Sequence, residues 1–141
     1  MRLPNVHEAV GFATLLAAAR RINGVFTSSE FNVKNFQGRG RVLWSSSLGV
    51  GTTPVCTPLL QQRETDADNW ESVPAAALPG GGFTTVTNAV GGGTQEVQVD
   101  LTQCKQRLRL QVTITGSAGQ GFESCAFLEG MAAPRRPDVA I

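Results

Sequence analysis

The strict alternation of apolar and polar residues in RLRLQVTIT, residues 107–115, limits the fold of this chain more than any other stretch. Leu108, Leu110, Val112 and Ile114 fall on one side of an extended chain, and polar residues fall on the other. A period of two is typical of a strand with one buried face and one solvated face. QEVQVDL repeats the period, so the pattern predicts strands that each cover a core from one side.

Short stretches of this kind follow one another from residue 25 onward, with glycine-rich turns between them. No helical pattern interrupts them, and a parallel α/β sheet would need intervening helices. The chain is therefore predicted to be all-β: an antiparallel β-sandwich, jelly-roll-like, with about eight strands. The expected strands lie at residues 25–36, 38–47, 55–64, 70–73, 83–90, 95–101, 107–115 and 122–129.

Residues 59–73, LLQQRETDADNWESV, have the pattern of a hairpin. TDADN is turn chemistry, because Asp and Asn side chains bond their own backbone. Trp70 then begins a short second strand and is expected to anchor it in the core. Pro58 lies inside the first strand and predicts an edge or a bulge there, because proline cannot donate to a ladder.

The N-terminal stretch AVGFATLLAAA, residues 9–19, resembles the core of a signal peptide but lacks its flanks. Glu8 stands where a positive segment is expected, and the run is too short to span a bilayer. We therefore expect residues 1–22 to be a partner-contacting arm of the mature chain. Apolar residues at i, i+4 spacing favour a helix, but the run is apolar on nearly every side, which suits an extended arm equally well. A β-sandwich domain at 23–130 and a C-terminal tail at 131–141 follow.

Few residues carry catalytic or metal-binding chemistry. His7 is the single histidine of the chain, so neither a metal site nor a base-activated nucleophile is suggested. Asp66, Asp68 and Glu71 lack the spacing of a calcium loop and are expected to form a solvated turn. The glycine clusters lack the Lys-Ser/Thr end of a phosphate loop and have the pattern of hairpin turns. We expect no enzyme activity, no cofactor and no metal.

The three cysteines do not form a disulfide framework, since their number is odd and their spacings are not those of a metal site. We expect Cys56, Cys104 and Cys125 to be reduced, buried thiols. The alternative is one disulfide bridge, for example between Cys56 and Cys104, and one free thiol.

Charge is sparse and balanced. Charged residues make up 16% of the chain and the net charge is +1, so no strong field would attract nucleic acid or an anionic membrane. Arg107 and Arg109 are placed on the solvent face of their strand, where they protect an edge or meet carboxylates of a neighbour. Trp44 and Trp70 are interpreted as core anchors, not as aromatic surfaces on which nucleic-acid bases stack.

LQQRETDADNWESVPAAAL, a glycine-rich gap, and then QEVQVDLTQCKQRLRLQVTIT resemble a family of small β-sandwich proteins from tailed-bacteriophage heads. These are head decoration, or cement, proteins, and the resemblance covers roughly residues 20–130. This chain departs from the pattern at residues 106–108, where an aromatic residue is usual. The resemblance implies a structural virion protein that binds the outer capsid surface and stabilises contacts between major capsid subunits. It also implies a homo-oligomer such as a trimer, located on the virion and in the host cytoplasm during assembly.

The expected partner contacts lie at the two ends of the chain. A carbohydrate-binding β-sandwich module and a phage tail or baseplate component are the alternative functions; an exposed aromatic platform would favour the first. The residues predicted to bind the major capsid protein or further copies of the chain are Val10, Phe12, Leu15, Leu16, Ile22, Arg135 and Arg136.

Overall fold

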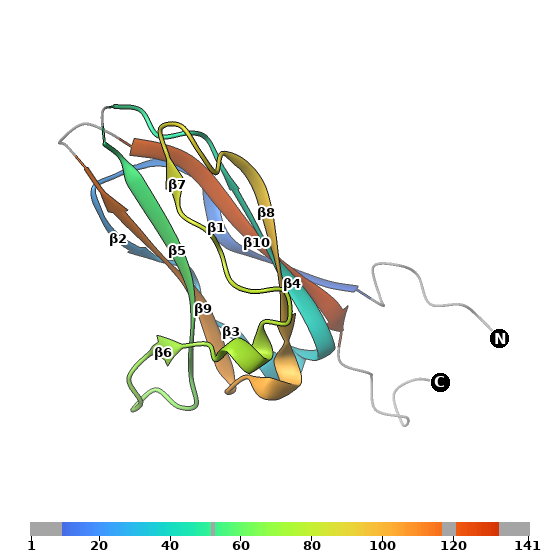
Figure 1. Cartoon of the computed structure of the whole chain (residues 1–141). Helices are drawn as coiled ribbons and strands as arrows, with labels where there is room; N and C mark the ends of the chain where they lie inside the picture. The colour runs from blue at the N-terminus through green and yellow to red at the C-terminus, as the bar shows by residue number, and fades with distance from the viewer. Residues whose placement is uncertain (1–9, 52, 117–120, 133–141) are drawn as a thin grey trace, which may run out of the picture.

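Two antiparallel sheets face each other in the computed structural model, which describes residues 10–51, 53–116 and 121–132 (Figure 1). The side chains of residues 10–13, 35–37 and 130–132 lie outside that description, as do residues 1–9 and the predicted tail from residue 133. One sheet has the order β1-β10-β4-β8 and the other has the order β2-β9-β5-β6, with β3 paired to β9 and β7 paired to β5. The strands are β1 (Val10–Ile22), β2 (Gly24–Thr27), β3 (Phe31–Asn32), β4 (Phe36–Ser46), β5 (Val55–Arg63), β6 (Glu71–Ser72), β7 (Val86–Thr87), β8 (Gly93–Asp100), β9 (Arg107–Thr115) and β10 (Gly121–Ala132).

Three short 3-10 helices, η1 (Val33–Asn35), η2 (Ala75–Ala77) and η3 (Leu101–Gln103), complete the elements of the described chain. The paired strands are nested: β1 pairs with β10, β2 with β9, β4 with β8, and β5 with β6 and β7. A long antiparallel ribbon that is rolled into two sheets gives this order, which is that of a jelly roll. The predicted β-sandwich is therefore confirmed.

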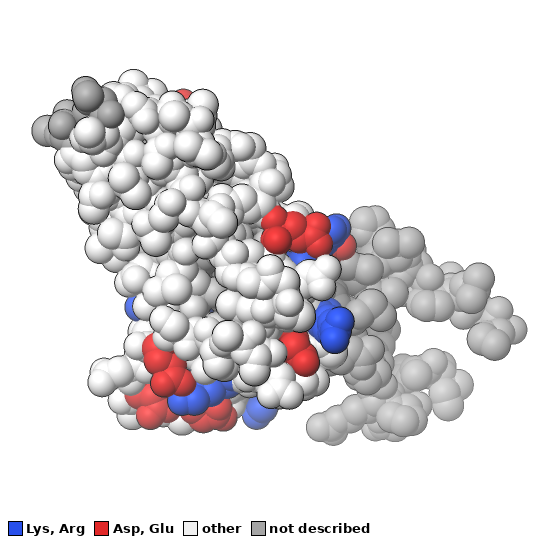
Figure 2. Space-filling view, in the orientation of Figure 1, with Lys and Arg blue, Asp and Glu red and all other residues white. Residues whose placement is uncertain are grey.

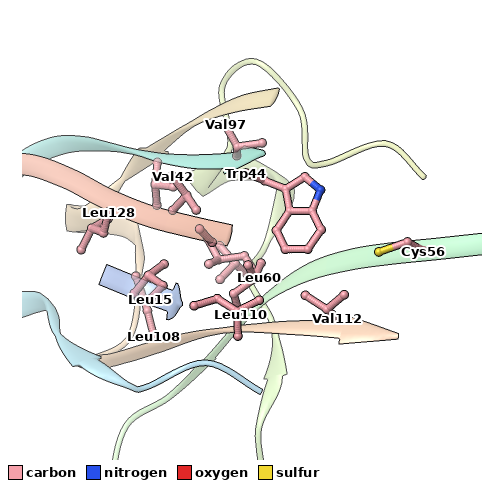
Figure 3. Packing of buried hydrophobic residues seen from close by; sticks show 14 of the residues in the cluster. Leu15, Val42, Trp44, Cys56, Leu60, Val97, Leu108, Leu110, Val112 and Leu128 are labelled. Carbon is pink, nitrogen blue, oxygen red and sulfur yellow. The ribbon is translucent and has the colours of Figure 1, made fainter. Parts of the chain in front are cut away.

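The core lies between the sheets and is built from the inward residues of the alternating strands. Figure 3 shows Val42, Trp44 and Val97 from one sheet facing Leu60 and Leu110 from the other. All four apolar positions of β9 are at most 2% exposed, which confirms the side predicted for them. Trp44 is fully buried, as predicted, and its indole Nε1 has no hydrogen-bond partner among the described residues.

The N-terminal run is a strand, so the helical alternative for residues 10–22 is wrong. β1 pairs with β10 along its length, with register shifts between Thr14 and Leu16 and between Leu16 and Ala19. Leu15 and Leu16 point into the core and are 4% and 7% exposed. This segment is thus an outer strand of the sandwich. The i, i+4 spacing was uninformative because a run of nearly continuous apolar residues matches a strand as well as a helix.

Pro58 explains why the strand beside β5 is broken into β6 and β7. On one side Pro58 is in register with Val112 of β9. On the other side β7 pairs with residues 55 and 56 and β6 with residues 61 and 62, so neither reaches residue 58. Leu60 accepts a bond from the Val73 N–H on that side, and alternate residues of a strand direct their backbone groups the same way. The backbone nitrogen of Pro58 faces the same side and has no hydrogen to donate. β5 is therefore an edge strand, as predicted, only in the gap between β6 and β7.

Trp70 is not a core residue, which corrects the prediction. The hairpin itself forms, with Gln61 opposite Ser72 and Gln62 opposite Glu71. Trp70 lies just before β6, is half-buried, and stacks on guanidinium groups. Because β5 and β9 carry Arg63 and Arg109 on the outer face of the sheet, a tryptophan that folds over this face meets cations and not the interior.

Candidate binding surface

Charge is segregated along the chain and therefore in space. Four long runs contain no Lys, Arg, Asp or Glu: residues 22–29, 42–62, 72–95 and 110–122. In a rolled ribbon these runs meet at one end of the sandwich, where β1 turns into β2, β4 into β5 and β7 into β8. Figure 2 shows charged side chains gathered around β6 and the short helices, whereas the opposite end is almost free of them on this face.

The uncharged end also carries most of the exposed large aliphatic side chains. Of the six in the described residues, five lie there, and the sixth, Leu59, lies in the middle of β5. We call these five residues the apolar end: Ile22 (52% exposed), Val25 (60%), Leu48 (44%), Val50 (62%) and Val90 (66%). Exposed apolar side chains that cluster on a protein surface often mark a site of contact with another molecule.

Hydrogen bonds between loops hold the apolar end in one arrangement. Gly49 makes the packing of its loop feasible, since a Cβ there would come within 2.6 Å of both Phe122 and Pro54. Gly24 has a φ of +145° at the corner between β1 and β2, a conformation that favours glycine. The bonds that join the loops are Gly49 N to Thr87 O (3.0 Å), Val50 N to Gly121 O (3.1 Å), Asn88 Nδ2 to Gly51 O (3.0 Å) and Asn23 Nδ2 to Gly116 O (2.6 Å).

An open trough lies beside the apolar end, on the outer face of the β1-β10-β4 sheet. Its volume is about 440 Å³, and alanine, serine and cysteine side chains line it together with Arg20 and Glu123. A smaller hollow of about 210 Å³ shares Arg20, Ser47 and Glu123 with the trough and extends it to Leu48 and Val50. The trough therefore leads directly to the apolar end.

Arg21 fixes the wall that β1 contributes to this trough. Its Nη2 donates to the carbonyl of Ala17 (2.8 Å), and its Nη1 donates to the carbonyls of Ala19 (3.1 Å) and Ser124 (3.0 Å). These acceptors lie at the irregular part of β1 and on the neighbouring β10. A planar guanidinium can reach several carbonyls at once, so Arg21 holds Ala18 and Ala19 at the rim of the trough.

The opposite end of the sandwich is charged but internally paired. Glu30 and Asp66 each contact both Arg63 and Arg107, which links β5, β9 and the two turns beside them. Thus Arg107 meets carboxylates, as the sequence suggested, but those of its own chain. We call these four residues the charged cluster.

Trp70 lies next to this cluster, with the Cζ atoms of Arg63 and Arg109 at 4.4 and 4.3 Å from the ring centroid. Burial, and then the nearby Arg63 charge, lowers the pKa of Arg109. Gln61 Oε1 accepts a bond from Arg109 Nε at 2.9 Å. The arrangement is a packed stack on the sheet, and the exposed large hydrophobic residues of the described chain are all aliphatic. An aromatic platform for sugars is therefore not among them.

The acidic turn is solvated, as expected. The backbone N–H and hydroxyl of Thr65 donate to Asp68 and lower the pKa of its carboxyl group. A bond from Lys105, and then one from Gln62, lowers the pKa of Glu71. The part of the chain that the structure describes contains no group of three or more His, Cys, Asp or Glu side chains able to hold a metal ion.

All three cysteines are free thiols, which excludes the bridged alternative. Cys56 is buried in the core, and burial raises its pKa to about 12. Cys104 is half-buried, with a pKa that burial raises to about 11. Cys125 is also half-buried and lines the trough. Burial was thus predicted correctly for Cys56 and overestimated for the other two.

The predicted contact residues fall into three groups. Ile22 belongs to the apolar end. Leu15 and Leu16 are occupied by the chain's own core, so their side chains are not presented to a partner. The side chains of Val10 and Phe12 lie outside the description, as do Arg135, Arg136 and His7. Contacts through these residues stay predictions.

Val50, Val90 and the trough were missed from the sequence. The signal was present for part of this surface: Leu48 and Val50 are single large aliphatic residues inside a glycine-rich loop that carries no charge, whereas Val90 ended an expected strand. No strand pattern accounts for a large aliphatic residue in such a loop, and the structure shows that these side chains are exposed.

No protein-family model matches the chain, and no curated protein matches it. Three of the solved structures with some likeness to the chain are of viral proteins. Infectious bursal disease virus of the Gt strain gives 10% identity and a TM-score of 0.45 over 89% of this chain and 34% of that chain. The Gx strain gives 12% identity and a TM-score of 0.40 over 85% and 30%. The coat protein of Tobacco streak virus gives 10% identity and a TM-score of 0.28 over 100% and 96%. The chain thus spans about a third of the length of the first two.

None of the helices in the described residues is both long and apolar enough to cross a membrane.

Proposed function

We propose that the chain is a structural, non-enzymatic virion protein that binds the outer capsid surface and stabilises contacts between major capsid subunits. The apolar end carries this proposal. It presents five exposed aliphatic side chains in uncharged runs of the sequence. The charged cluster lies at the opposite end of the sandwich, and its ions are already paired. A partner that covers the apolar end would bury apolar area, and the two charged side chains beside Leu48 and Val50, Arg20 and Glu123, are of opposite sign.

The bracing of the loops makes the apolar end suitable for a repeated contact. Because bonds such as Val50 N to Gly121 O already hold the loops, little conformational entropy is lost when a partner binds. A protein that covers a capsid in many copies can use modest contacts, since neighbouring copies add avidity. The charged cluster would then face solvent and keep the decorated surface hydrated.

The arm and the tail supply further proposed contacts. Val10 and Phe12 at the start of β1 would form a second contact, at the end of that strand opposite to Ile22, and Arg135 and Arg136 in the tail would add to the contacts with the partner. A deletion of residues 1–20 cannot test this, because it removes most of β1 and leaves β10 without its partner. A deletion that ends at residue 9 keeps β1 and tests the preceding segment alone.

The first experiment determines whether the chain is part of a particle. Particles from the source material are purified, their mass is measured by light scattering, and the chain is located by electron microscopy. Many copies on the outside of a shell are expected. A chain found only as a free small species would refute the proposal, and a location on the tail would replace the head assignment with the tail or baseplate alternative.

The second experiment tests the surface by adding purified variants to particles stripped of the chain. Val50→Glu places a carboxylate in the apolar end, and we expect at least a tenfold loss of affinity, or about 1.4 kcal/mol or more. Leu59→Glu is the matched control, since Leu59 is exposed but lies away from this end. Equal occupancy for Val50→Glu and the wild type would exclude the apolar end as the capsid contact. Binding of the free chain to a glycan panel would instead favour a carbohydrate-binding module.

A further inference from the structure

A pocket lies at the charged end of the sandwich, between the short helices η1 and η3. Val33 and Lys34 of η1 line one side, Leu101 and Thr102 of η3 line the other, and Glu64, directly after β5, borders it as well. Its volume is about 440 Å³. We call it the η1–η3 pocket. Leu101 belongs to the core and Val33 packs against that core, so apolar groups lie between the charged side chains of the rim.

The rim of the η1–η3 pocket carries one charge of each sign. Lys34 and Glu64 are both exposed, and the Glu64 carboxylate accepts a bond from the Gln106 N–H at 3.2 Å. Neither side chain takes part in an ion pair among the described residues, whereas the nearby Lys105 is paired with Glu71. An occupant that carries both signs of charge and an apolar side chain would match this pocket.

The chain leaves its last strand beside this pocket. Ala132, at the end of β10, is opposite Phe36, at the start of β4, and Figure 1 shows these two strand ends together. Two of the residues that line the pocket, Lys34 and Gly38, are each two residues from Phe36, which is at most about 7 Å along the chain. Residues 133–141, APRRPDVAI, therefore begin within a short distance of the pocket.

This segment carries the groups that the pocket lacks. Arg135 and Arg136 supply positive charge for the rim carboxylate, Asp138 supplies negative charge for the rim ammonium, and Val139 is an apolar side chain for the region between them. Asp138 is six residues from Ala132, a span of up to about 20 Å when extended. The segment is thus long enough to enter the pocket and complementary to it in both signs of charge.

We propose that residues 133–141 dock in the η1–η3 pocket of their own chain, with an arginine on Glu64 and Asp138 on Lys34. The source is the same chain because so short a connection gives an effective concentration on the order of millimolar, which favours it over a second copy. The inference goes beyond the proposed function, since it concerns the free chain. Docking holds Arg135 and Arg136 at the charged end, so their contact with a capsid requires release of the segment.

A zero-length cross-linker tests the contact in the unaltered chain. A carbodiimide joins an amine to a carboxylate in contact with it, and the chain has two lysines, Lys34 and Lys105. We expect an amide between Lys34 and Asp138, identified by mass spectrometry. The pair of Lys105 and Glu71, with Nζ and Oε1 2.6 Å apart, is the internal positive control. A control product without the Lys34–Asp138 product, or a product between Lys34 and Glu64 in its place, would refute the docking.

Isotope labelling identifies the chain that supplies the segment. The cross-linker is added to an equal mixture of chains labelled with nitrogen-15 and unlabelled chains. We expect the Lys34–Asp138 product to be wholly labelled or wholly unlabelled, because both residues come from one chain. Products with one labelled and one unlabelled half would overturn docking within one chain and assign the pocket to the segment of a second copy.

A charge swap tests the second ion pair. Glu64→Lys should repel the arginines and lower the yield of the Lys34–Asp138 product at least fivefold, and Arg135→Glu with Arg136→Glu in the same chain should restore it. Glu123→Lys is the matched control, because Glu123 is exposed and lines the trough instead. Circular dichroism verifies that each variant is folded. A yield that Glu64→Lys leaves unchanged, or that the swap does not restore, would exclude this pairing.

The docking and the capsid proposal can fail separately. A free chain without the Lys34–Asp138 product refutes the docking and leaves the capsid proposal standing if the chain still decorates particles. A product that persists when the chain is bound to particles supports the docking and removes Arg135 and Arg136 from the proposed capsid contacts.

Discussion

Replacement of Arg21 by lysine should destabilise the sandwich at one defined place. Lysine keeps the positive charge but has a single donor nitrogen, whereas Arg21 uses two nitrogens to reach the carbonyls of Ala17, Ala19 and Ser124 at 2.8, 3.1 and 3.0 Å. Lysine can retain one of these bonds. Arg21→Lys thus isolates the contribution of the guanidinium geometry from that of the charge.

The magnitude follows from the exposure of the acceptors. A hydrogen bond to a charged group contributes about 1.5–3 kcal/mol when water cannot replace it. The bonds to Ala17 and Ala19 are exposed, so water replaces much of their contribution, whereas the bond to Ser124 is partly buried. We expect a loss of about 1–2 kcal/mol in the free energy of unfolding. With a urea dependence of about 2 kcal/mol per molar, the midpoint falls by about 0.5–1 M.

Urea unfolding followed by tryptophan fluorescence, to which the buried Trp44 and the half-buried Trp70 both contribute, measures this loss. Arg39→Lys is the control, because Arg39 is exposed on β4, and its change should stay within about 0.5 kcal/mol. An unchanged midpoint in Arg21→Lys would refute the idea that the guanidinium holds the irregular part of β1.

Three further predictions concern single side chains. Trp70→Ala should lower the free energy of unfolding by about 1–2 kcal/mol, because two guanidinium stacks of about 0.5–1 kcal/mol each are lost; thermal unfolding that matches the wild type would contradict the stack. The carboxyl group of Asp68 should titrate by NMR below 3.8, so its stabilising effect is present above its unfolded pKa and is lost as the pH falls through the folded value; Thr65→Val should raise the titration midpoint toward 3.8, and an unshifted midpoint would be evidence against the bond. Cys56, with a pKa of about 12, should resist Ellman's reagent at a pH of about 8 until urea unfolds the chain, and rapid labelling of native Cys56 would contradict its burial. Because burial raises its pKa, its contribution to stability is fully present below the unfolded pKa and is lost as the pH rises through the folded value.

The sequence predicted the fold wherever one face of a strand is buried and the other is wet. β9 shows this best, because Leu108 and Ile114 alternate with polar residues and the structure buries the apolar set. β1 could not be assigned in the same way. Its residues from Val10 to Ala19 carry no charge and little polarity, so the period that distinguishes strand from helix is absent. Pairing with β10, a contact across most of the chain, decides its conformation.

The candidate site was harder to predict because it depends on contacts between segments far apart. The trough exists because β1 departs from regular pairing at Leu16 and because Arg21 holds the departure open, and neither is visible in a local pattern. Trp70 was misplaced for a related reason. Its environment is set by Arg63 and Arg109, which come from two different strands. Residue type alone favours burial of tryptophan, and only the register of β5 and β9 reveals the cations.

The nested ribbon has a consequence for the synthesis of the chain. β10, the last strand, lies between β1 and β4 in the finished sheet. Until residues 121–132 leave the ribosome, β1 has no strand to pair with and β4 has a free edge, so the first strand must wait for the last. Contacts between such distant segments make folding slow. The newly made chain therefore depends on late insertion of β10, and a ribosome that stalls before residue 121 would release a chain with open edges prone to aggregation.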